Sequence, residues 1–494
     1  MKRYFNIKHF IISLFAGSML FISSCQKSLK EDVYSFIVTD NFYKTPSDAE
    51  AAVVAAYQPF TNTNYFKLGF YNLCLLADDE VTIGRNPQFQ AVDNFNLTPD
   101  HAFTSTLWTE MYNCINRANI GISRLPAIPM DANRKAVLVA ECQFIRAYNY
   151  FNLVRLFGGV PLSTKEIQSA ADANNPKATV QQVYQQIISD LKAAEIVLPA
   201  TRTSAEVGRA TQGAAKTLLA DVYLTTEQWT DAASKAKEVM QANTYQLLPD
   251  FASIFSVSNE NNAEIIFAIQ FDGPINGNSM ASYSQAGGTD NPNCANGAQV
   301  WSVDTNSDMW KTWDTNDSRR NFSVYDKFTN KSGKLIDLYT TARPFPAFGK
   351  YNAPNETSQG NCPLNPDVYR YADVLLIYAE ATSQAAGTPP ADAYDAVNMV
   401  RRRAYKKPLT TVSTIDLPAG LSKDAFRQAV LRERSLEFVI ENRRLFDLMR
   451  TGQFPSLLKT LGKTINEKAT LFPIPLAEMN TNTALKSSDQ NTGY

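Results

Sequence analysis

Hydrophobic and polar residues recur at helical spacing over most of residues 40–260, which predicts an N-terminal helical region. Its first helix should begin at Thr45-Pro46-Ser47-Asp48, where threonine can cap, proline takes the first helical position and aspartate lies in the positive first turn. The segment Val137–Phe157 is apolar on nearly every face and predicts a helix that is covered on most sides. Gly158-Gly159 and the proline after them predict its end.

Two later segments, Gln212–Leu224 and Trp229–Met240, predict a pair of antiparallel helices. Small alanines recur in both, and small residues facing an aromatic at such spacing are typical of tetratricopeptide units, in which helix pairs stack on one another. We therefore predict an all-α dominated fold that is built from tetratricopeptide-like helical pairs.

The pattern changes between residues 261 and 367. Glu264–Phe271 is a strand-like apolar run, and glycine, asparagine, serine and aspartate are frequent after it. Helical spacing returns in Tyr369–Ala386, Asp392–Tyr405 and Lys423–Arg450. These changes predict a loop-rich insertion with short strands at 261–367, followed by a C-terminal helical region at 368–494.

The N-terminus has the order of an export signal, with basic residues ahead of an apolar stretch, Phe10–Ile22, that is too short to span a bilayer. Ile22-Ser23-Ser24-Cys25 fits the cleavage pattern of bacterial lipoproteins. This pattern predicts a signal peptide at 1–24 and lipid attachment at Cys25. The polar and charged run Gln26–Asp32 predicts a lipid-anchored tether at 25–39, which more than one acyl chain would hold stably in a membrane.

The charge balance does not favour a nucleic-acid partner. The chain has 47 basic and 48 acidic residues, and removing a leader with three basic residues would leave 44 against 48, a net charge of about −4. The basic run Arg401-Arg402-Arg403 is interpreted as a solvated helix end that complements the helix dipole.

The cysteines do not predict a zinc site, because none of them has CxxC spacing. Cys142 lies in an apolar helical run, where a free thiol packs as a small hydrophobic group. Cys294 and Cys362 lie in loop-like sequence and are the one candidate disulfide.

Five blocks of the sequence carry a family resemblance. They are AECQFIRAYNYFNLVRLFGGVPL (140–162), GRATQGAAKTLLADVYLTTEQW (208–229), RYADVLLIYAEA (370–381), LRERSLEFVIENRRLFDLMRTG (431–452) and LFPIPLAEMNTN (471–482). In these blocks, in their order and in the lipid-attachment cysteine, the chain resembles the SusD/RagB family of nutrient-binding lipoproteins of the outer membrane.

The resemblance implies a SusD-like superhelix that supports a variable, loop-rich face and binds oligosaccharide outside the cell for polysaccharide utilisation. It also implies a lipid-anchored position on the outer membrane and a SusC-like TonB-dependent transporter as partner. Polar residues within the blocks are interpreted as buried or half-buried pairs of the scaffold, because buried charges need partners. These residues are Arg146, Tyr150, Arg370, Asp373, Glu380, Arg432, Glu437 and Asp447.

No catalytic residue and no cofactor is expected. After the leader the chain has one histidine, His101, which is interpreted as the start of a helix near the surface. Asp78, Asp79 and Glu80 could supply the carboxylate pair of a glycoside hydrolase, which needs its carboxyls about 5–9.5 Å apart. A solvated loop, or contacts to sugar hydroxyls, explains these three residues equally well.

The run Asp304–Asp308 resembles the beginning of a calcium-binding loop. Met309 stands where such a loop needs glycine, and Thr315 stands in place of the closing glutamate. We therefore predict no metal site of this type, while a calcium site of another geometry stays open.

Sugar binding needs flat apolar rings together with short polar side chains. Three of the five tryptophans lie in the insertion, and two of them, Trp310 and Trp313, would share a face on a helical turn. Packing of these rings against the helical body is the alternative. Tyr283 lies among serine and glycine and is expected to be exposed. The ligand-binding candidates from the insertion and from the loop at 62–94 are Tyr65, Asp78, Asp79, Arg85, Asn86, Tyr283, Trp301, Trp310 and Trp313.

The sequence thus favours a cell-surface glycan-binding lipoprotein that delivers oligosaccharide to a transporter and does no chemistry on it. Capture of peptides, which some relatives perform, is the nearest alternative. A glycoside hydrolase and a helical-repeat adaptor without a small ligand are two further alternatives. Trp108 and Trp229 lie in the helical blocks and are expected in the core.

Overall fold

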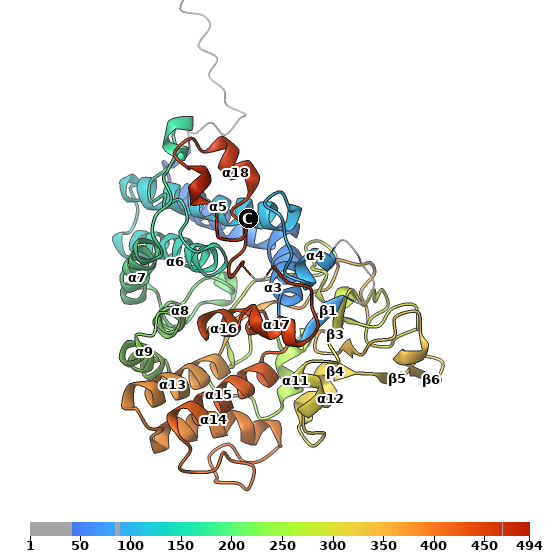
Figure 1. The fold of residues 1–494 in the computed structure, drawn as a ribbon. Coiled ribbons are helices and arrows are strands. Elements are labelled where there is room, and N and C mark those ends of the chain that lie inside the picture. The colour runs from blue at the N-terminus through green and yellow to red at the C-terminus, as the bar shows by residue number, and fades with distance from the viewer. Residues whose placement is uncertain (1–41, 84–88, 467) are drawn as a thin grey trace, which may run out of the picture. The chain divides into compact units, whose positions relative to one another are not determined.

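The computed structural model describes residues 42–83, 89–466 and 468–494, and the predicted all-α dominated fold is confirmed within them (Figure 1). Thr45–Tyr494 forms one compact unit. The first helix, α2 (Pro46–Tyr57), begins as predicted. The Thr45 side chain accepts from the Asp48 N–H, and the Asp48 carboxylate accepts from the Thr45 N–H at 2.8 Å.

The N-terminal helical region consists of helices that follow one another along the chain. After α2 they are α3 (Gly69–Leu76), α4 (Gln90–Asp93), α5 (Ala102–Arg124), α6 (Ala132–Phe157), α7 (Val180–Val197), α8 (Gln212–Thr225) and α9 (Trp229–Gln241). The C-terminal region contains α13 (Tyr371–Ala386), α14 (Ala391–Ala404), α15 (Lys423–Glu437), α16 (Arg444–Arg450), α17 (Ser456–Thr460) and α18 (Leu476–Thr481).

Successive helices pack on their neighbours in space. Helix α5 packs on α6, α6 on α7, α7 on α8 and α8 on α9, and α9 then packs on α13, which packs on α14 (Figure 1). Alanines at the α8–α9 contact, including Ala215, Ala232 and Ala236, are fully buried and let the two helices approach closely. This arrangement is the stack of helical pairs that the sequence predicts.

The apolar helix α6 lies in the middle of this stack. Most of its side chains from Leu138 to Phe157 are buried, as its apolar faces require. It ends at Gly158, whose φ of 72° is a left-handed conformation that glycine adopts at little cost. Trp108 is also in the core as predicted, whereas Trp229 is half-buried with the Arg427 guanidinium 5.2 Å from its ring centroid, so the prediction for Trp229 is wrong.

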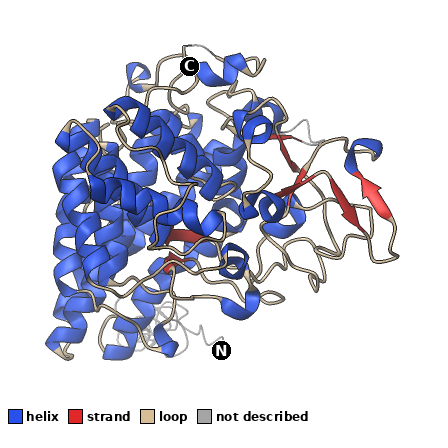
Figure 2. Cartoon of the chain, turned by 90° about the horizontal axis from the view of Figure 1, so that it is seen from below, coloured by secondary structure: helices blue, strands red, loops and turns tan. Residues whose placement is uncertain are grey.

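Strands are short and pair two by two in antiparallel fashion, and Figure 2 shows them as small pieces among loops. The pairs are β1 (Val81–Ile83) with β3 (Trp301–Val303), β2 (Ile265–Ala268) with β8 (Asp367–Arg370), β4 (Val324–Tyr325) with β7 (Ala347–Phe348), and β5 (Lys327–Thr329) with β6 (Leu335–Asp337). Because β2 and β8 are paired, the chain enters and leaves the insertion at one place. The insertion also carries short helices, namely α10 (Met280–Ser284), α11 (Asp308–Thr312) and α12 (Ser318–Ser323).

The prediction of one continuous helix at Lys423–Arg450 is wrong. Helix α15 ends at Glu437 and α16 begins at Arg444. Between them, Ile440 and Asn442 have φ values of 54° and 56°, which no α-helix accommodates. The break directs the Glu441 side chain into the interior, where it pairs with Lys350 and Arg370.

The candidate disulfide is not formed. Cys294 and Cys362 are both free, and the Cys294 thiol instead lies 3.2 Å from Glu356 Oε2 as a hydrogen-bond donor. Among the residues that the structure describes, no helix combines the length and the hydrophobicity needed to cross a bilayer.

Candidate functional site

The insertion is fastened to the N-terminal region through the pairing of β1 with β3, in which Ile83 lies opposite Trp301. The Trp301 ring is fully buried, and its indole N–H donates to Asn72 Oδ1 at 2.9 Å. Its ring contacts Tyr71 on one side and Tyr283 on another, with centroid distances of 5.9 and 5.5 Å. Trp301 therefore anchors the insertion, in agreement with the alternative that these rings pack against the helical body. The ring is inaccessible to a ligand.

Three other candidates from the N-terminal loop also lie in the interior. The Tyr65 hydroxyl donates to Asn149 Oδ1 at 2.9 Å and the ring is fully buried. The Asp78 carboxylate accepts from the backbone N–H groups of Glu80 and Val81. Both Asp79 oxygens accept from Arg444, at 2.6 and 2.7 Å. The expectation that they contact a ligand does not agree with this burial, so we leave these residues out of the binding surface.

Two carboxyls of the acidic run, those of Asp78 and Glu80, have raised pKa values. Burial raises the pKa of Asp78 well above its ordinary value, and the neighbouring charges of Glu80 and Asp79 raise it further. Burial also raises the pKa of Glu80 to about 7, although Arg444 opposes this shift. Glu80 accepts a hydrogen bond from the Ser435 hydroxyl of α15. The run thus ties β1 to the C-terminal helices.

Cys25, Arg85 and Asn86 lie outside the described residues, so their predicted roles stay predictions. Asp304, in the run that resembles a calcium loop, is buried, and its carboxylate accepts from the Asn306 N–H at 2.8 Å. In the described ranges no group of three or more His, Cys, Asp or Glu residues could hold a metal ion.

Tyr283 is the predicted aromatic residue that reaches the surface next to this anchor. Tyr283 is half-buried, while the other residues of α10 are buried, namely Met280, Ala281, Ser282 and Ser284. One part of its ring packs against Trp301, so a buried tryptophan supports the accessible ring from behind. A ring held in this way loses little conformational freedom when a ligand packs on it.

A pocket of about 430 Å³ begins shortly after α10 and is lined by Gly287, Gly288, Thr289, Gly297, Thr341, Ala342 and Arg343. Glycine is required here for close approach, because a Cβ on Gly287 would lie 2.1 Å from the Gly297 carbonyl oxygen. The Thr289 hydroxyl has no hydrogen-bond partner although its oxygen is buried. The pocket therefore contains an unpaired hydroxyl, and the Arg343 side chain is part of its lining.

The two remaining tryptophans do not share a face. Trp310 lies on α11 and is half-buried, with the Arg320 guanidinium 5.3 Å from its ring centroid. Trp313 follows the end of α11 in an extended conformation, and only 4% of it is exposed. The prediction of a shared face is wrong because α11 ends before Trp313. Trp310 stays available as a second accessible ring.

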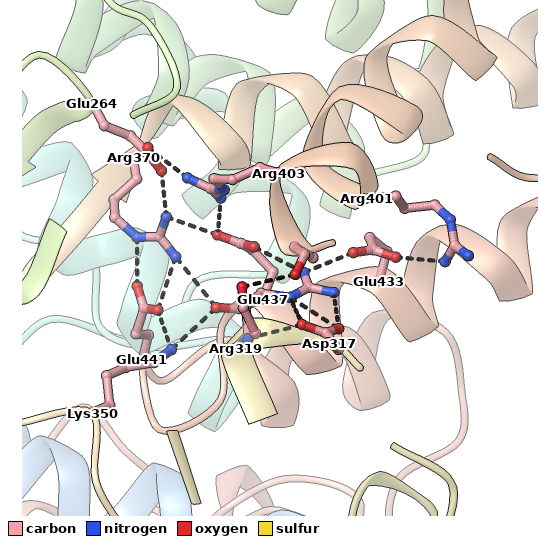
Figure 3. Close-up of polar contacts among 12 residues, drawn as sticks. Glu264, Asp317, Arg319, Lys350, Arg370, Arg401, Arg403, Glu433, Glu437 and Glu441 are labelled. Carbon is pink, nitrogen blue, oxygen red and sulfur yellow. Dashed lines mark hydrogen bonds and ion pairs between the residues drawn. The ribbon is translucent and has the colours of Figure 1, made fainter. Parts of the chain in front are cut away.

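A buried ion cluster lies where the insertion meets the C-terminal helices (Figure 3). The Arg370 guanidinium is fully buried and donates to Glu264, Glu437 and Glu441 at 2.7–3.0 Å. Arg403 is 1% exposed and bridges Glu264 and Glu437, so the interpretation of the basic run as a solvated helix end is wrong for this residue. Three insertion residues enter the same cluster. These three are Asp317, Arg319 and Lys350, paired with one another or with Glu433, Glu437 and Glu441. The cluster thus fixes the insertion on the helical stack.

The predicted scaffold pairs are largely confirmed. Arg146 pairs with Asp190, Glu380 with Arg450, Asp373 with Arg443, and Asp447 with Arg434, and all four pairs are largely buried. The Tyr150 hydroxyl donates to the Ser163 carbonyl oxygen at 2.8 Å. Arg432 is half-buried as predicted, but it is the exception because it donates to Thr312 Oγ1 and the Asp308 carbonyl oxygen and not to a carboxylate.

The sequence did not predict that Thr289, Arg343 and three glycines would line a pocket. The spacing of Gly287, Gly288 and Gly297 was visible, but it indicated only irregular chain. The close approach of Gly287 and Gly297 is a tertiary contact between two loop segments, and no local pattern encodes it.

The chain is thus a helical scaffold protein. Its stacked helical pairs carry a loop-rich insertion that contains a polar pocket. Two family profiles match the chain. One, described as starch-binding associating with outer membrane, matches residues 48–224, and the other, described as the SusD family, matches residues 346–494. The chain belongs to the SusD/RagB family.

Relatives and solved structures extend this similarity over the chain. SusD-like protein P2 of Formosa agariphila is 29% identical over 452 residues, which cover 85% of this chain and 87% of that protein. A solved SusD homologue from Bacteroides thetaiotaomicron has a TM-score of 0.80 at 24% identity and covers 92% of this chain and 98% of its own. A solved laminarin-binding SusD-like protein has a TM-score of 0.76 at 26% identity and covers 92% of this chain and all of its own.

Proposed function

We propose that this protein captures oligosaccharide at the cell surface through the face formed by Tyr283 and the glycine-lined pocket. We call this surface the capture face and define it by Tyr283, Gly287, Gly288, Thr289, Gly297 and Arg343. The observation that carries the proposal is the half-buried Tyr283 ring, held against Trp301, together with a pocket that begins four residues further along the chain and contains an unpaired Thr289 hydroxyl. A pyranose needs such a flat apolar surface for its C–H groups and polar groups for its hydroxyls.

The ligand class is supported by the chemistry of the face. An apolar ligand would leave the Thr289 hydroxyl and the backbone groups of the pocket without partners, which costs free energy. A ligand rich in hydroxyls supplies donors and acceptors to all of them. The laminarin-binding relative, at 26% identity, makes β-glucans the first ligands to test.

The membrane attachment and the partner are part of the same proposal. Acylation of Cys25 would hold the protein on the outer membrane, in keeping with the family description of outer-membrane association. The captured glycan would then pass to a SusC-like TonB-dependent transporter. The protein itself would act as a binding protein and not as an enzyme.

Affinity electrophoresis in gels that contain laminarin, starch, xylan or mannan tests the proposal. Retardation by at least one glycan, with no release of reducing ends on incubation, is the expected result. Loss of that retardation in Tyr283→Ala would place binding on the capture face. Release of shorter sugars by the purified protein would reject the proposal. The absence of retardation in every glycan gel would also reject it.

A further inference from the structure

A second pocket, of about 690 Å³, lies between residues 251–258 and the insertion loops around 273–274 and 352–363. Its volume falls within the range of about 300–1,000 Å³ that small-molecule sites occupy. None of its lining residues belongs to the capture face. We call it the Phe322 pocket, after the half-buried ring that lines it, and nothing in the proposed function uses it.

The apolar wall of the Phe322 pocket is built from two rings. Phe255 and Phe322 stack with their centroids 5.9 Å apart and an interplanar angle of 28°. The Lys350 ammonium lies 4.9 Å from the Phe255 ring centroid, and Tyr351 meets Phe255 edge to face. Phe255 is therefore fixed by the core, and it in turn holds Phe322 as a platform at the pocket.

The polar wall contains acceptors that lack donors. Glu356 is 4% exposed, and its Oε2 accepts from the Cys294 thiol. Its Oε1 accepts no hydrogen bond of good geometry, although the backbone N–H groups of Gly360 and Asn361 lie close enough to the carboxylate to lower its pKa. Asn352 Oδ1, in the same wall, has no hydrogen-bond partner. A buried acceptor without a well-formed hydrogen bond costs free energy, so two of them in one pocket indicate a ligand that donates hydrogen bonds.

The loop that carries these acceptors is held in place without a ligand. The Ala353 N–H donates to the Asn293 carbonyl oxygen at 2.9 Å, and Gln285 Nε2 donates to the Tyr351 carbonyl oxygen at 2.8 Å. Asn296 Nδ2 donates to the Glu356 carbonyl oxygen at 2.7 Å. Because these contacts order the loop beforehand, a ligand would not bear the cost of ordering it.

From this geometry we infer that the Phe322 pocket binds a single pyranose ring, with its C–H face on Phe322 and its hydroxyls donating to Glu356 Oε1 and Asn352 Oδ1. A purely apolar ligand would leave both acceptors unpaired. A cation is disfavoured because burial raises the pKa of Glu356, so the site resists a full negative charge. A neutral polyol ring with one apolar face satisfies the rings and the acceptors together.

Saturation-transfer NMR with the purified protein tests this inference, using the methyl glycosides of glucose, galactose, mannose and xylose as probes. Tetrahydropyran serves as the comparison compound, because it has the ring without the hydroxyl donors. At least one glycoside should receive saturation, and tetrahydropyran should receive none. Phe322→Leu, which removes the platform and keeps an apolar side chain, should weaken glycoside binding at least tenfold.

Glu356→Gln tests the acceptor with little change of shape and should also weaken binding at least tenfold. Tyr184→Ala, a change of a half-buried tyrosine on α7, is the matched control and should bind the glycoside within twofold of wild type. Tyr283→Ala should lose retardation in glycan gels and keep the glycoside signal, so failure of the capture face and failure of the Phe322 pocket are distinguishable. The inference is overturned if no glycoside is saturated, if tetrahydropyran binds as well, or if the signal survives both pocket variants.

Discussion

The ion cluster around Arg370 and the capture face differ in whether their polar groups have partners. The Arg370 guanidinium is removed from water and donates to three carboxylates. On the capture face, a threonine hydroxyl lacks a partner and a tyrosine ring is left half-covered. The first arrangement holds one conformation because every lost contact would leave a buried charge. The second leaves polar and apolar surface for a solute.

The two regions are mechanically connected. Asp317, Arg319 and Lys350 of the insertion enter the ion cluster, and Trp301 anchors β3 beside Tyr283. Because the ion cluster stabilises the fold and the capture face is proposed to bind the ligand, variants of the cluster should change stability. Variants of the capture face should change affinity and leave stability nearly unchanged. Four substitutions test this separation.

Arg370→Ala should have the largest effect. It removes the shared partner of Glu264, Glu437 and Glu441, and breaking a buried ion pair in this way costs about 3–5 kcal/mol for a single pair. Urea unfolding followed by circular dichroism measures the loss. Lys327→Ala is the control, because its pair with Asp337 is exposed and such surface pairs contribute little to stability. Equal losses in the two variants would contradict the role of the cluster.

Trp301→Ala should be the next most damaging, because it empties a fully buried ring site and leaves Asn72 Oδ1 without its donor. Truncation of a buried tryptophan costs about 3–5 kcal/mol. Thermal unfolding measures this cost. Trp301→Phe keeps an aromatic ring and should recover most of the stability. A variant Trp301→Ala as stable as wild type would mean that the ring is accessible after all.

The acidic run that holds β1 predicts a smaller, pH-dependent effect. Because burial raises the pKa of Glu80 from 4.5 to about 7, the folded state keeps a proton between these values that the unfolded state releases. The unfolding free energy should therefore fall as the pH rises from about 4.5 to 7, by about 1–3 kcal/mol from this group. Glu80→Gln should reduce the fall in urea titrations at several pH values, and Glu227→Gln, an exposed carboxylate, should not. An identical slope in Glu80→Gln would refute this assignment.

Tyr283→Ala should have the smallest effect on stability, within about 1 kcal/mol, because the side chain is half-buried and its hydroxyl has no structural partner among the described contacts. Differential scanning calorimetry checks this expectation. A loss as large as that of Trp301→Ala would show that Tyr283 belongs to the anchor and not to the capture face.

The same contrast explains what the sequence could predict. The helical stack follows from apolar spacing, from the Thr45 cap and from the glycine stop after Phe157, all of which are local. The charged residues of the five blocks were assigned to buried pairs because charge inside a helix bundle needs a partner, and Arg370 and Glu437 fulfil this. The break after Glu437 was missed, since it depends on left-handed residues that are not glycine.

In the insertion, by contrast, composition indicated the kind of surface and not the direction of each side chain. Trp301 and Tyr283 were equally good candidates, and the pairing of β1 with β3 decides that one is buried and the other reaches solvent. The sequence around Asp79 is typical of a loop, and it does not indicate that Asp79 pairs with Arg444, which is distant in the sequence. Loops have no periodicity that encodes these tertiary contacts.

Isothermal titration of the glycan selected by the gel panel into wild type, Tyr283→Ala and Tyr184→Ala tests the central claim most directly. We predict saturable binding to wild type and to Tyr184→Ala, and at least a tenfold weaker affinity for Tyr283→Ala at an unchanged melting temperature. Binding of equal strength to all three proteins would contradict the claim that the capture face holds the glycan.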